Sequence, residues 1–358
     1  MIQNTEGKMT LKKALQQIRP VSSETKKAAR LRWDQVAKPL NSLGILEEDL
    51  VRIAGAQNSE AVCLDQKWIA VMCADNGIVE EGVTQTGQEV TAIVAENFLK
   101  GDTSACVMCR QCGTDVFPVD VGMASDTKVP SDLKVMMGTR NMTKEPAMTY
   151  EEAVQGIEAG IEMVRRLKEQ GYRLIATGEM GIGNTTTSSA VASVLLNRSV
   201  EEMTGRGAGL SGEGLKRKID AIKRAVKLNE PDPSDPVDVL AKVGGLDIAG
   251  MAGVFMGGAV YRIPVVIDGF ISCVAALVAQ RISPLTKDYM IASHVSREPA
   301  AAMILEALEK EAVLHGEMCL GEGSGAVALF PFIDMGLAVY ESMSTFEEIK
   351  VEQYEELV

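Results

Sequence analysis

Acidic side chains next to glycines are the first candidates for chemistry in this chain. Glu179 lies in GEMGIGNTT, Asp268 in VVIDGF and Glu322 in LGEGSGA. Glycine neighbours let a ligand come close to the backbone, and a carboxylate within hydrogen-bond reach of that ligand can accept a proton. A glycine-flanked acid is also common in turns, so each motif alone leaves a purely structural role open. Together the three acids indicate acid–base chemistry on a small molecule.

The stretch 174–189, LIATGEMGIGNTTTSS, adds groups that favour an anion. We expect an apolar strand that ends in Thr177, then a loop that carries Glu179 and Asn184, then a helix over 189–196. Backbone amides at a helix start, with hydroxyls beside them, suit a phosphate group. The alternative is a plain strand-to-helix turn with a Ser/Thr cap. A carboxylate beside a phosphate is repulsive unless it has a separate task, such as binding a ligand hydroxyl or a proton.

A second glycine-rich loop, GRGAGL (205–210), precedes a basic helix predicted for residues 214–228. The cations of this helix include Lys216, Arg217, Lys218, Lys223 and Arg224. A charged helix face of this kind is usually solvated. In a protein with a net charge of −13, however, a cation cluster directly after a glycine loop is a candidate partner for a phosphate.

Several well-known signatures are missing. No G-x-G-x-x-G follows the first predicted strand, which disfavours a nucleotide-binding oxidoreductase, and no Walker lysine or G-x-S-x-G is present. A C-x2-C-x2-C run falls at residues 106, 109 and 112 in a predicted helix, where ligands three residues apart drift around the axis. We therefore expect core thiols rather than a cluster site, and neither a metal nor a cofactor for the reaction.

The composition is that of a soluble globular protein, with 358 residues, 46% apolar and 24% charged. The net charge of −13, without any Lys/Arg-rich run, argues against nucleic acid and anionic membrane surfaces as partners. We find no signal-peptide pattern and no uninterrupted apolar run of bilayer length, since glycines and charges interrupt the most apolar region, 243–279. Seven cysteines, an odd number, suggest reduced thiols and a cytoplasmic setting.

Strands alternate with helices from residue 67 onward, which predicts an α/β fold with a mostly parallel, Rossmann-like sheet and helices on both faces. Apolar strands are expected at 68–73, 115–121, 173–177, 265–268 and 289–292, and one long helix at 92–111. The acids and glycine loops follow strands, and the carboxyl ends of parallel strands form the edge where such sheets bind ligands. We expect residues 1–60 and the tail 335–358 to form a small helical domain beside a catalytic α/β domain over 61–334.

Six motifs occur in a fixed order along the chain. They are DNG…EEGV…QEVT (75–91), GEMGIGNTT (178–186), GRGAGL with GLKRK (205–218), VVIDGF (265–270), SHVSREP (293–299) and LGEGSGA (320–326). Together they strongly resemble the motifs of the nicotinate-nucleotide–dimethylbenzimidazole phosphoribosyltransferase family, and KPLNSLGILE near the N-terminus resembles that family's KPxGSLGxLE. The resemblance spans nearly the whole chain, and six ordered motifs are far more specific than any one of them.

The resemblance implies transfer of 5-phosphoribose from nicotinate mononucleotide to a base, usually 5,6-dimethylbenzimidazole, with inversion at the anomeric carbon. The products are nicotinate and an α-ribotide, α-ribazole 5′-phosphate, used for the lower ligand of cobalamin-type cofactors. Glu322 falls at the family's general base, Glu179 at the second carboxylate and Gln88 in the segment that lines the base pocket. Positions that hold the mononucleotide fall at or beside Gly181, Gly183, Gly207, Lys218, Gly269 and Ser296, and we add Asn184, Thr185 and Asp268 from the same loops.

One segment departs from the family pattern. Residues 82–88 read GVTQTGQ, where many relatives carry GVSAYPQ, so an aromatic side chain and a proline are missing. The reaction class survives this difference, but the accepted base does not follow from it, since some relatives act on adenine, other benzimidazoles or phenols. We expect a homodimer. The alternatives are a subunit of a heteromeric enzyme that activates phenols and a non-catalytic partner subunit; the presence of both Glu179 and Glu322 argues against the second.

Overall fold

The computed structural model describes residues 9–355. In these residues the chain forms the strands β1 (Lys67–Ala74), β2 (Asp115–Gly122), β3 (Leu174–Met180), β4 (Val265–Ile267) and β5 (Met290–Ala292). The helices are α1 (Leu11–Gln17), α2 (Ser23–Gln35), α3 (Ile45–Gln57), η1 (Gly77–Glu81), α4 (Glu89–Lys100), α5 (Ser104–Gln111), α6 (Tyr150–Glu169), α7 (Asn184–Leu195), α8 (Val200–Met203), α9 (Gly212–Asn229), α10 (Pro236–Val243), α11 (Leu246–Tyr261), α12 (Phe270–Ile282), η2 (Pro284–Tyr289), α13 (Ala301–Ala307), α14 (Ser324–Ser342) and α15 (Phe346–Ile349).

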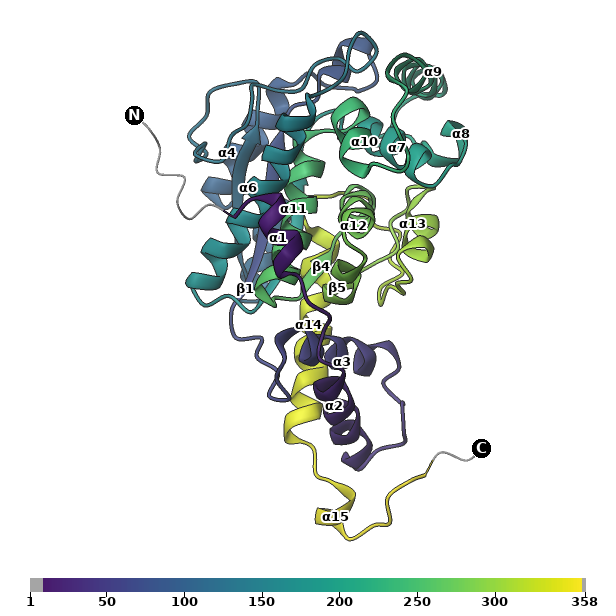
Figure 1. Cartoon of the computed structure of the whole chain (residues 1–358). Coiled ribbons are helices and arrows are strands. Elements are labelled where there is room, and N and C mark those ends of the chain that lie inside the picture. Colours follow the sequence, from purple (N-terminus) through teal and green to yellow (C-terminus); the bar gives the residue numbers. More distant parts are fainter. Residues whose placement is uncertain (1–8, 356–358) are drawn as a thin grey trace.

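The strands form one parallel sheet in the order β2-β1-β3-β4-β5 (Figure 1). The chain runs from β1 to β2 on one side and from β3 through β4 to β5 on the other, so the order reverses between β1 and β3. A reversal of this kind opens a crevice at the carboxyl ends of the strands. Met72 of β1 pairs with Glu179 of β3, which places that carboxylate at the crevice. The parallel α/β fold predicted from the sequence is confirmed.

Helices cover both faces of the sheet, which explains why the central strands are almost continuously apolar. In β1, Met72 belongs to a core shared with α6, α11 and α12, whereas Ile69 and Val71 belong to a second core with α4, α5 and α14. α6 and α11 pack so closely that a side chain at Gly160 or Gly253 would overlap the backbone of the other helix. This close packing buries α11 almost completely against the sheet.

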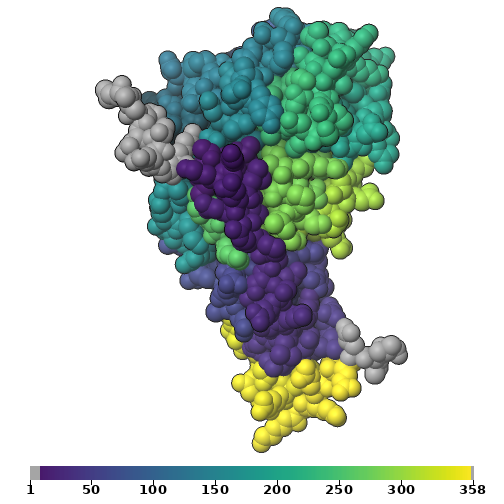
Figure 2. Space-filling view, in the orientation of Figure 1, coloured from purple at the N-terminus to yellow at the C-terminus, as the bar shows by residue number. Residues whose placement is uncertain are grey.

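A narrower helical part extends from one end of the sheet and combines α2, α3, α15 and the C-terminal part of α14 (Figures 1 and 2). Its core includes an edge-to-face contact between Trp33 and Tyr340, with ring centres 5.1 Å apart. α1 lies instead against α6 and α11, where the Leu11 amide donates a hydrogen bond to Glu158 (3.0 Å). α14 runs without a break through the proposed boundary at 334/335. The division into two domains stays a prediction.

Three element boundaries differ from the sequence-based prediction. The long helix expected at 92–111 is two helices, because Gly101 adopts a left-handed conformation (φ 72°) that ends α4 and the Thr103 hydroxyl caps α5. β3 does not end at the predicted position but continues to Met180, because its pairing with β1 extends that far. α7 begins at Asn184, so the run of hydroxyl residues lies inside the helix rather than before it.

Among the described residues, α14 is the one helix long and apolar enough to cross a bilayer by length and composition. Half of it (50%) is buried, and it packs on α3, α5 and β3. A core helix of a globular protein meets the same criterion, so α14 gives no independent sign of a membrane.

Candidate active site

A cavity of about 270 Å³ lies at the carboxyl ends of β3, β4 and β5, between the N-termini of α7, α12 and α14. Nine of the predicted site residues line it, namely Glu179, Gly181, Asn184, Thr185, Gly207, Asp268, Gly269, Ser296 and Glu322. They come from five separate motifs, so the expected convergence at one edge of the sheet is observed. Three predicted residues, Gly183, Lys218 and Gln88, do not line the cavity itself.

Glu179 is a buried acid on β3 whose carboxylate is hydrogen-bonded to two other residues that line the cavity. Its carboxylate accepts hydrogen bonds from the Asn184 side chain and from the Glu322 backbone amide (3.4 Å). Burial, and next the neighbouring carboxylates Asp247 and Asp268, raise the pKa of Glu179 to about 8. At neutral pH the side chain is therefore a neutral acid, which removes the repulsion expected between a second carboxylate and a bound phosphate.

The raised pKa of Glu179 makes stability depend on pH. From its ordinary value of 4.5 up to about 8, folded Glu179 keeps a proton that the unfolded chain releases, so the free energy of unfolding should fall as pH rises through this window. Between pH 6.5 and 8 we expect Glu179 to contribute a loss of about 1–2 kcal/mol, measured by urea unfolding. The free energy of unfolding of the Glu179→Gln variant should vary less with pH by that amount. The Glu306→Gln variant, changed at an exposed position, should show the same pH dependence as the parent chain. Parallel slopes for both variants would contradict the assignment.

Asp268 connects the end of β4 to the start of α14. Its two carboxylate oxygens accept hydrogen bonds from the amides of Gly323 (3.2 Å), Gly325 (2.7 Å) and Ala326 (3.0 Å). Burial raises the pKa of Asp268 to about 6, with the backbone amides acting against the rise. Because three amides already use this carboxylate, Asp268 positions the glycine-rich turn before α14, and its predicted contact with the mononucleotide stays a prediction.

Glu322 lies in this turn with a left-handed backbone (φ 63°), between Gly321 and Gly323, which are also left-handed (φ 91° and 90°). A side chain at Gly321 would overlap the Glu179 carboxylate, so glycine is required for the two acids to approach. The Glu322 carboxylate accepts a hydrogen bond from the Ala105 amide (3.1 Å) in the first turn of α5. The positive end of that helix therefore stabilises the negative charge of Glu322.

The opposite end of the cavity holds the cation. Lys218 of α9 is fully buried and donates hydrogen bonds to the Thr185 hydroxyl (2.9 Å) and the Gly205 carbonyl (3.2 Å). Burial lowers the pKa of Lys218 to about 8, and the carboxylate of Glu298 opposes this shift. Thr185 lines the cavity, so the Lys218 ammonium group lies next to the cavity wall that Thr185 and the glycine loop form.

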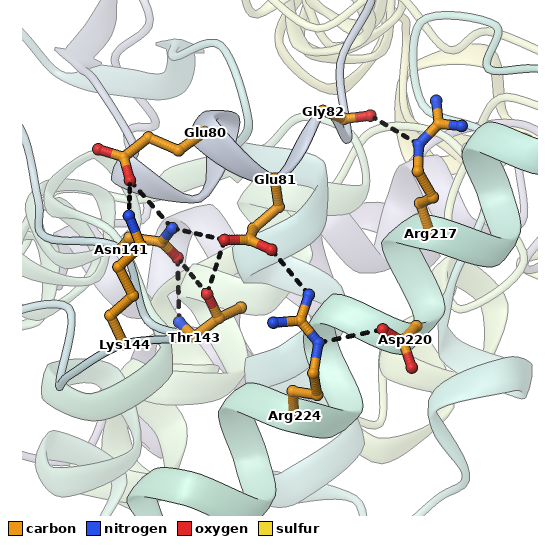
Figure 3. Close-up of polar contacts among 9 residues, drawn as sticks. All are labelled: Glu80, Glu81, Gly82, Asn141, Thr143, Lys144, Arg217, Asp220 and Arg224. Atoms are coloured by element: carbon orange, nitrogen blue, oxygen red, sulfur yellow. Dashed lines mark hydrogen bonds and ion pairs between the residues drawn. The ribbon is translucent and has the colours of Figure 1, made fainter.

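The other cations of α9 are engaged elsewhere. Arg224 forms ion pairs with Glu81 (2.7 Å) and Asp220 (3.0 Å), and Arg217 donates to the Gly82 carbonyl (3.4 Å), as Figure 3 shows. The solvated-face interpretation is therefore correct for these two arginines. Their contacts attach the end of η1 to α9, the helix that carries the buried lysine.

The segment that resembles the family's base pocket is bound to the glycine loop. Gln85 donates hydrogen bonds to the carbonyls of Ala208 (2.9 Å) and Gly209 (2.7 Å). Gln88 donates to the Asn76 carbonyl (3.2 Å), outside the cavity lining. Gly183 precedes α7 in a left-handed conformation (φ 96°) and so shapes the start of that helix. The predicted roles of Gln88 and Gly183 in binding are not visible in this geometry and stay predictions.

The polar lining residues that sequence reasoning missed include His294 and Glu298. Both belong to SHVSREP, the motif that contributed Ser296 to the predicted site, so the motif itself was the available signal. Burial lowers the pKa of His294, which makes it neutral at pH 7. Within residues 9–355 no group of three or more His, Cys, Asp and Glu side chains could hold a metal ion.

The comparisons with known proteins identify the family of this chain. A family model described as "Phosphoribosyltransferase" matches residues 18–351. The nicotinate-nucleotide–dimethylbenzimidazole phosphoribosyltransferase of Ruminiclostridium cellulolyticum is 50% identical over 98% of this chain and 100% of its own length, and that of Clostridium acetobutylicum is 46% identical over the same shares. The crystal structure of CobT from Thermus thermophilus matches with a TM-score of 0.87 at 38% identity, over 92% of this chain and 100% of that one. The chain therefore belongs to the nicotinate-nucleotide–dimethylbenzimidazole phosphoribosyltransferase family.

Proposed function

We propose that this enzyme transfers 5-phosphoribose from nicotinate mononucleotide to 5,6-dimethylbenzimidazole or a related base, as the names of its relatives state for those proteins. The products are α-ribazole 5′-phosphate and nicotinate, and the reaction serves assembly of the lower ligand of cobalamin. The observation that carries the proposal is the combination around one cavity of two acids, Glu322 and Glu179, with a buried lysine, Lys218, that is bonded to the lining residue Thr185. The phosphate belongs beside Lys218 and the two exchanging bases beside Glu322.

The chemistry needs few groups. A ring nitrogen of the incoming base forms a bond to the anomeric carbon while the bond to nicotinate breaks, and the bonding electrons neutralise the positive pyridinium nitrogen. The incoming base becomes cationic, which acidifies its other N–H, and Glu322 accepts that proton. Attack from the face opposite to nicotinate inverts the anomeric centre. No diphosphate leaves, so the departing group requires no metal.

The identity of the base is the first point to test. We expect the purified chain, given nicotinate mononucleotide and a panel of 5,6-dimethylbenzimidazole, benzimidazole, adenine and a phenol, to form an N-linked ribotide, detected by mass spectrometry. Product from the phenol alone would favour a subunit of a phenol-activating enzyme. A chain without product from any base would be a non-catalytic partner, and the proposal would fail.

We also propose a symmetric homodimer, the commonest closed oligomer. The helical part exposes large apolar side chains, with Leu31 on α2 56% exposed and Phe332 and Met335 on α14 42% and 57% exposed. Light scattering at micromolar concentration should return twice the chain mass of 38.4 kDa. A mass of one chain would contradict the dimer, and a larger complex formed only with a second, similar chain would favour the heteromer.

The remaining partners follow from charge and composition. With a net charge of −13 we propose small-molecule substrates and neither nucleic acid nor membrane as partners. All seven cysteines are free in the structure, which supports a cytoplasmic setting.

A further inference from the structure

Glu298 occupies the phosphate end of the cavity, where a second negative charge is unexpected. It follows β5 and lines the cavity together with Thr185 and Gly207. One carboxylate oxygen accepts a hydrogen bond from the Gly207 amide (3.1 Å). The other oxygen is buried and has no hydrogen-bond partner among residues 9–355. This oxygen packs on Gly205, so closely that any side chain there would overlap it.

The carboxylate and Lys218 are electrostatic partners across the glycine loop. The Glu298 charge favours the protonated form of Lys218 and opposes the effect of burial on the pKa of that lysine. Glu298 thus occupies two groups that an anionic ligand would use here, the backbone amide of Gly207 and the positive charge of Lys218. A buried carboxylate oxygen without a hydrogen-bond donor destabilises the arrangement, which favours replacement of Glu298 at Gly207 by an anionic ligand.

We propose that Glu298 is an anion that stands in for the phosphate of the mononucleotide and must release Gly207 before that phosphate binds. A phosphate dianion and a carboxylate cannot share one amide and one lysine without strong repulsion. Displacement frees the Gly207 amide for the ligand, while Lys218 and Thr185 keep their places and gain a doubly charged partner. Glu298 therefore lowers the affinity for the mononucleotide and keeps the glycine loop ordered in the empty site.

This inference rests on the proposed function, since it assumes that the phosphate lies beside Lys218. Its test is Glu298→Gln, which keeps the size of the side chain and an acceptor for Gly207 but removes the charge. Kinetics at pH 6.5, below the Lys218 pKa, keep that lysine protonated in the variant. The KM for nicotinate mononucleotide should fall about fivefold, the difference between a charged and a neutral hydrogen bond. The inhibition constant of inorganic phosphate, used as a competing probe, should fall in parallel.

The sign of the change decides between the stand-in role and direct substrate binding. A rise in KM or an unchanged KM in Glu298→Gln would overturn the inference, because binding is weakened when a group that contacts the ribose or another part of the substrate is removed. Glu298→Ala, which removes the acceptor as well, should shift KM in the same direction and gives a second reading if the glutamine variant folds poorly. Exposed Glu306→Gln on α13 is the control and should leave both constants unchanged. If the unaltered enzyme forms no ribotide, the proposed function fails instead, and direct phosphate binding still tests Glu298.

Discussion

Replacing Glu322 by glutamine should lower kcat toward an N–H base by about 10²- to 10⁴-fold, the usual contribution of a general base. Glutamine keeps the size of the side chain and tolerates the same left-handed backbone, but its amide cannot accept the proton of the attacking base. Its oxygen can still accept the hydrogen bond from Ala105, so the local structure should persist. The KM for nicotinate mononucleotide should change little, because the phosphate site proposed above is formed by Lys218 and the glycine loop and not by Glu322. Steady-state kinetics with 5,6-dimethylbenzimidazole measure both constants.

Glu317→Gln is the matched control, since Glu317 is an exposed glutamate in the same connection and has a similar left-handed backbone (φ 53°). It should leave kcat within about twofold of the parent enzyme, as is usual for a surface change away from the reacting groups. A phenol that reacts as its phenolate at high pH brings no proton, so the Glu322→Gln defect should shrink with that acceptor if the chain accepts one. Near-full activity of Glu322→Gln toward an N–H base at neutral pH would show that the proton acceptor is a group other than Glu322.

Lys218→Met should raise the KM for nicotinate mononucleotide about 10- to 100-fold, the cost of a lost charge-assisted hydrogen bond. Methionine retains most of the buried volume, and loss of a buried charge that is only partly paired need not destabilise the fold. In the parent enzyme the KM for nicotinate mononucleotide should rise as the pH increases through about 8, because Lys218 of the ligand-free enzyme loses its proton in this range. This rise should be weaker in Lys218→Met.

Lys227→Met tests whether the effect is specific, because Lys227 is exposed on the same helix. Its KM and pH profile should match those of the parent enzyme. If Lys218→Met also left the KM unchanged, the phosphate would lie elsewhere in the cavity, and Lys218 would be a structural cation that holds Thr185 and the glycine loop.

Local sequence was sufficient for the parts of the site that depend on neighbours along the chain. The alternation of apolar strands and helices predicted the parallel sheet, and the position of the motifs after strands predicted the edge where Asp268 and Glu322 meet. Glycine next to an acid predicted the close approach of a ligand; the structure shows that Gly321 leaves room for the Glu179 carboxylate, and the approach of a ligand stays a prediction. These inferences hold because strand direction and glycine conformation are properties of short segments.

Two errors of the sequence-based prediction have different origins. The strand that carries Glu179 continues to Met180 because β1 provides a pairing partner, and this partner is far away in the chain, with Cys73 opposite Met180. The helix predicted at 92–111 is interrupted by a glycine C-cap at Gly101 and an N-cap at Thr103, which are local signals that the sequence already contains. Long-range pairing outweighed the local pattern in the strand, whereas in the helix the local capping pattern was overlooked.

The sequence by itself determined the fold class, the family motifs and the set of candidate groups, because these follow from residue types and short-range spacing. Only the tertiary structure decided which groups act and in which state. The cations of α9 look equivalent in the sequence, yet Lys218 is the buried one, while Arg224 is paired with Glu81. The neutral form of Glu179 and the contact of Glu298 with Gly207 likewise depend on desolvation and on neighbours brought together from distant segments, which no local pattern encodes.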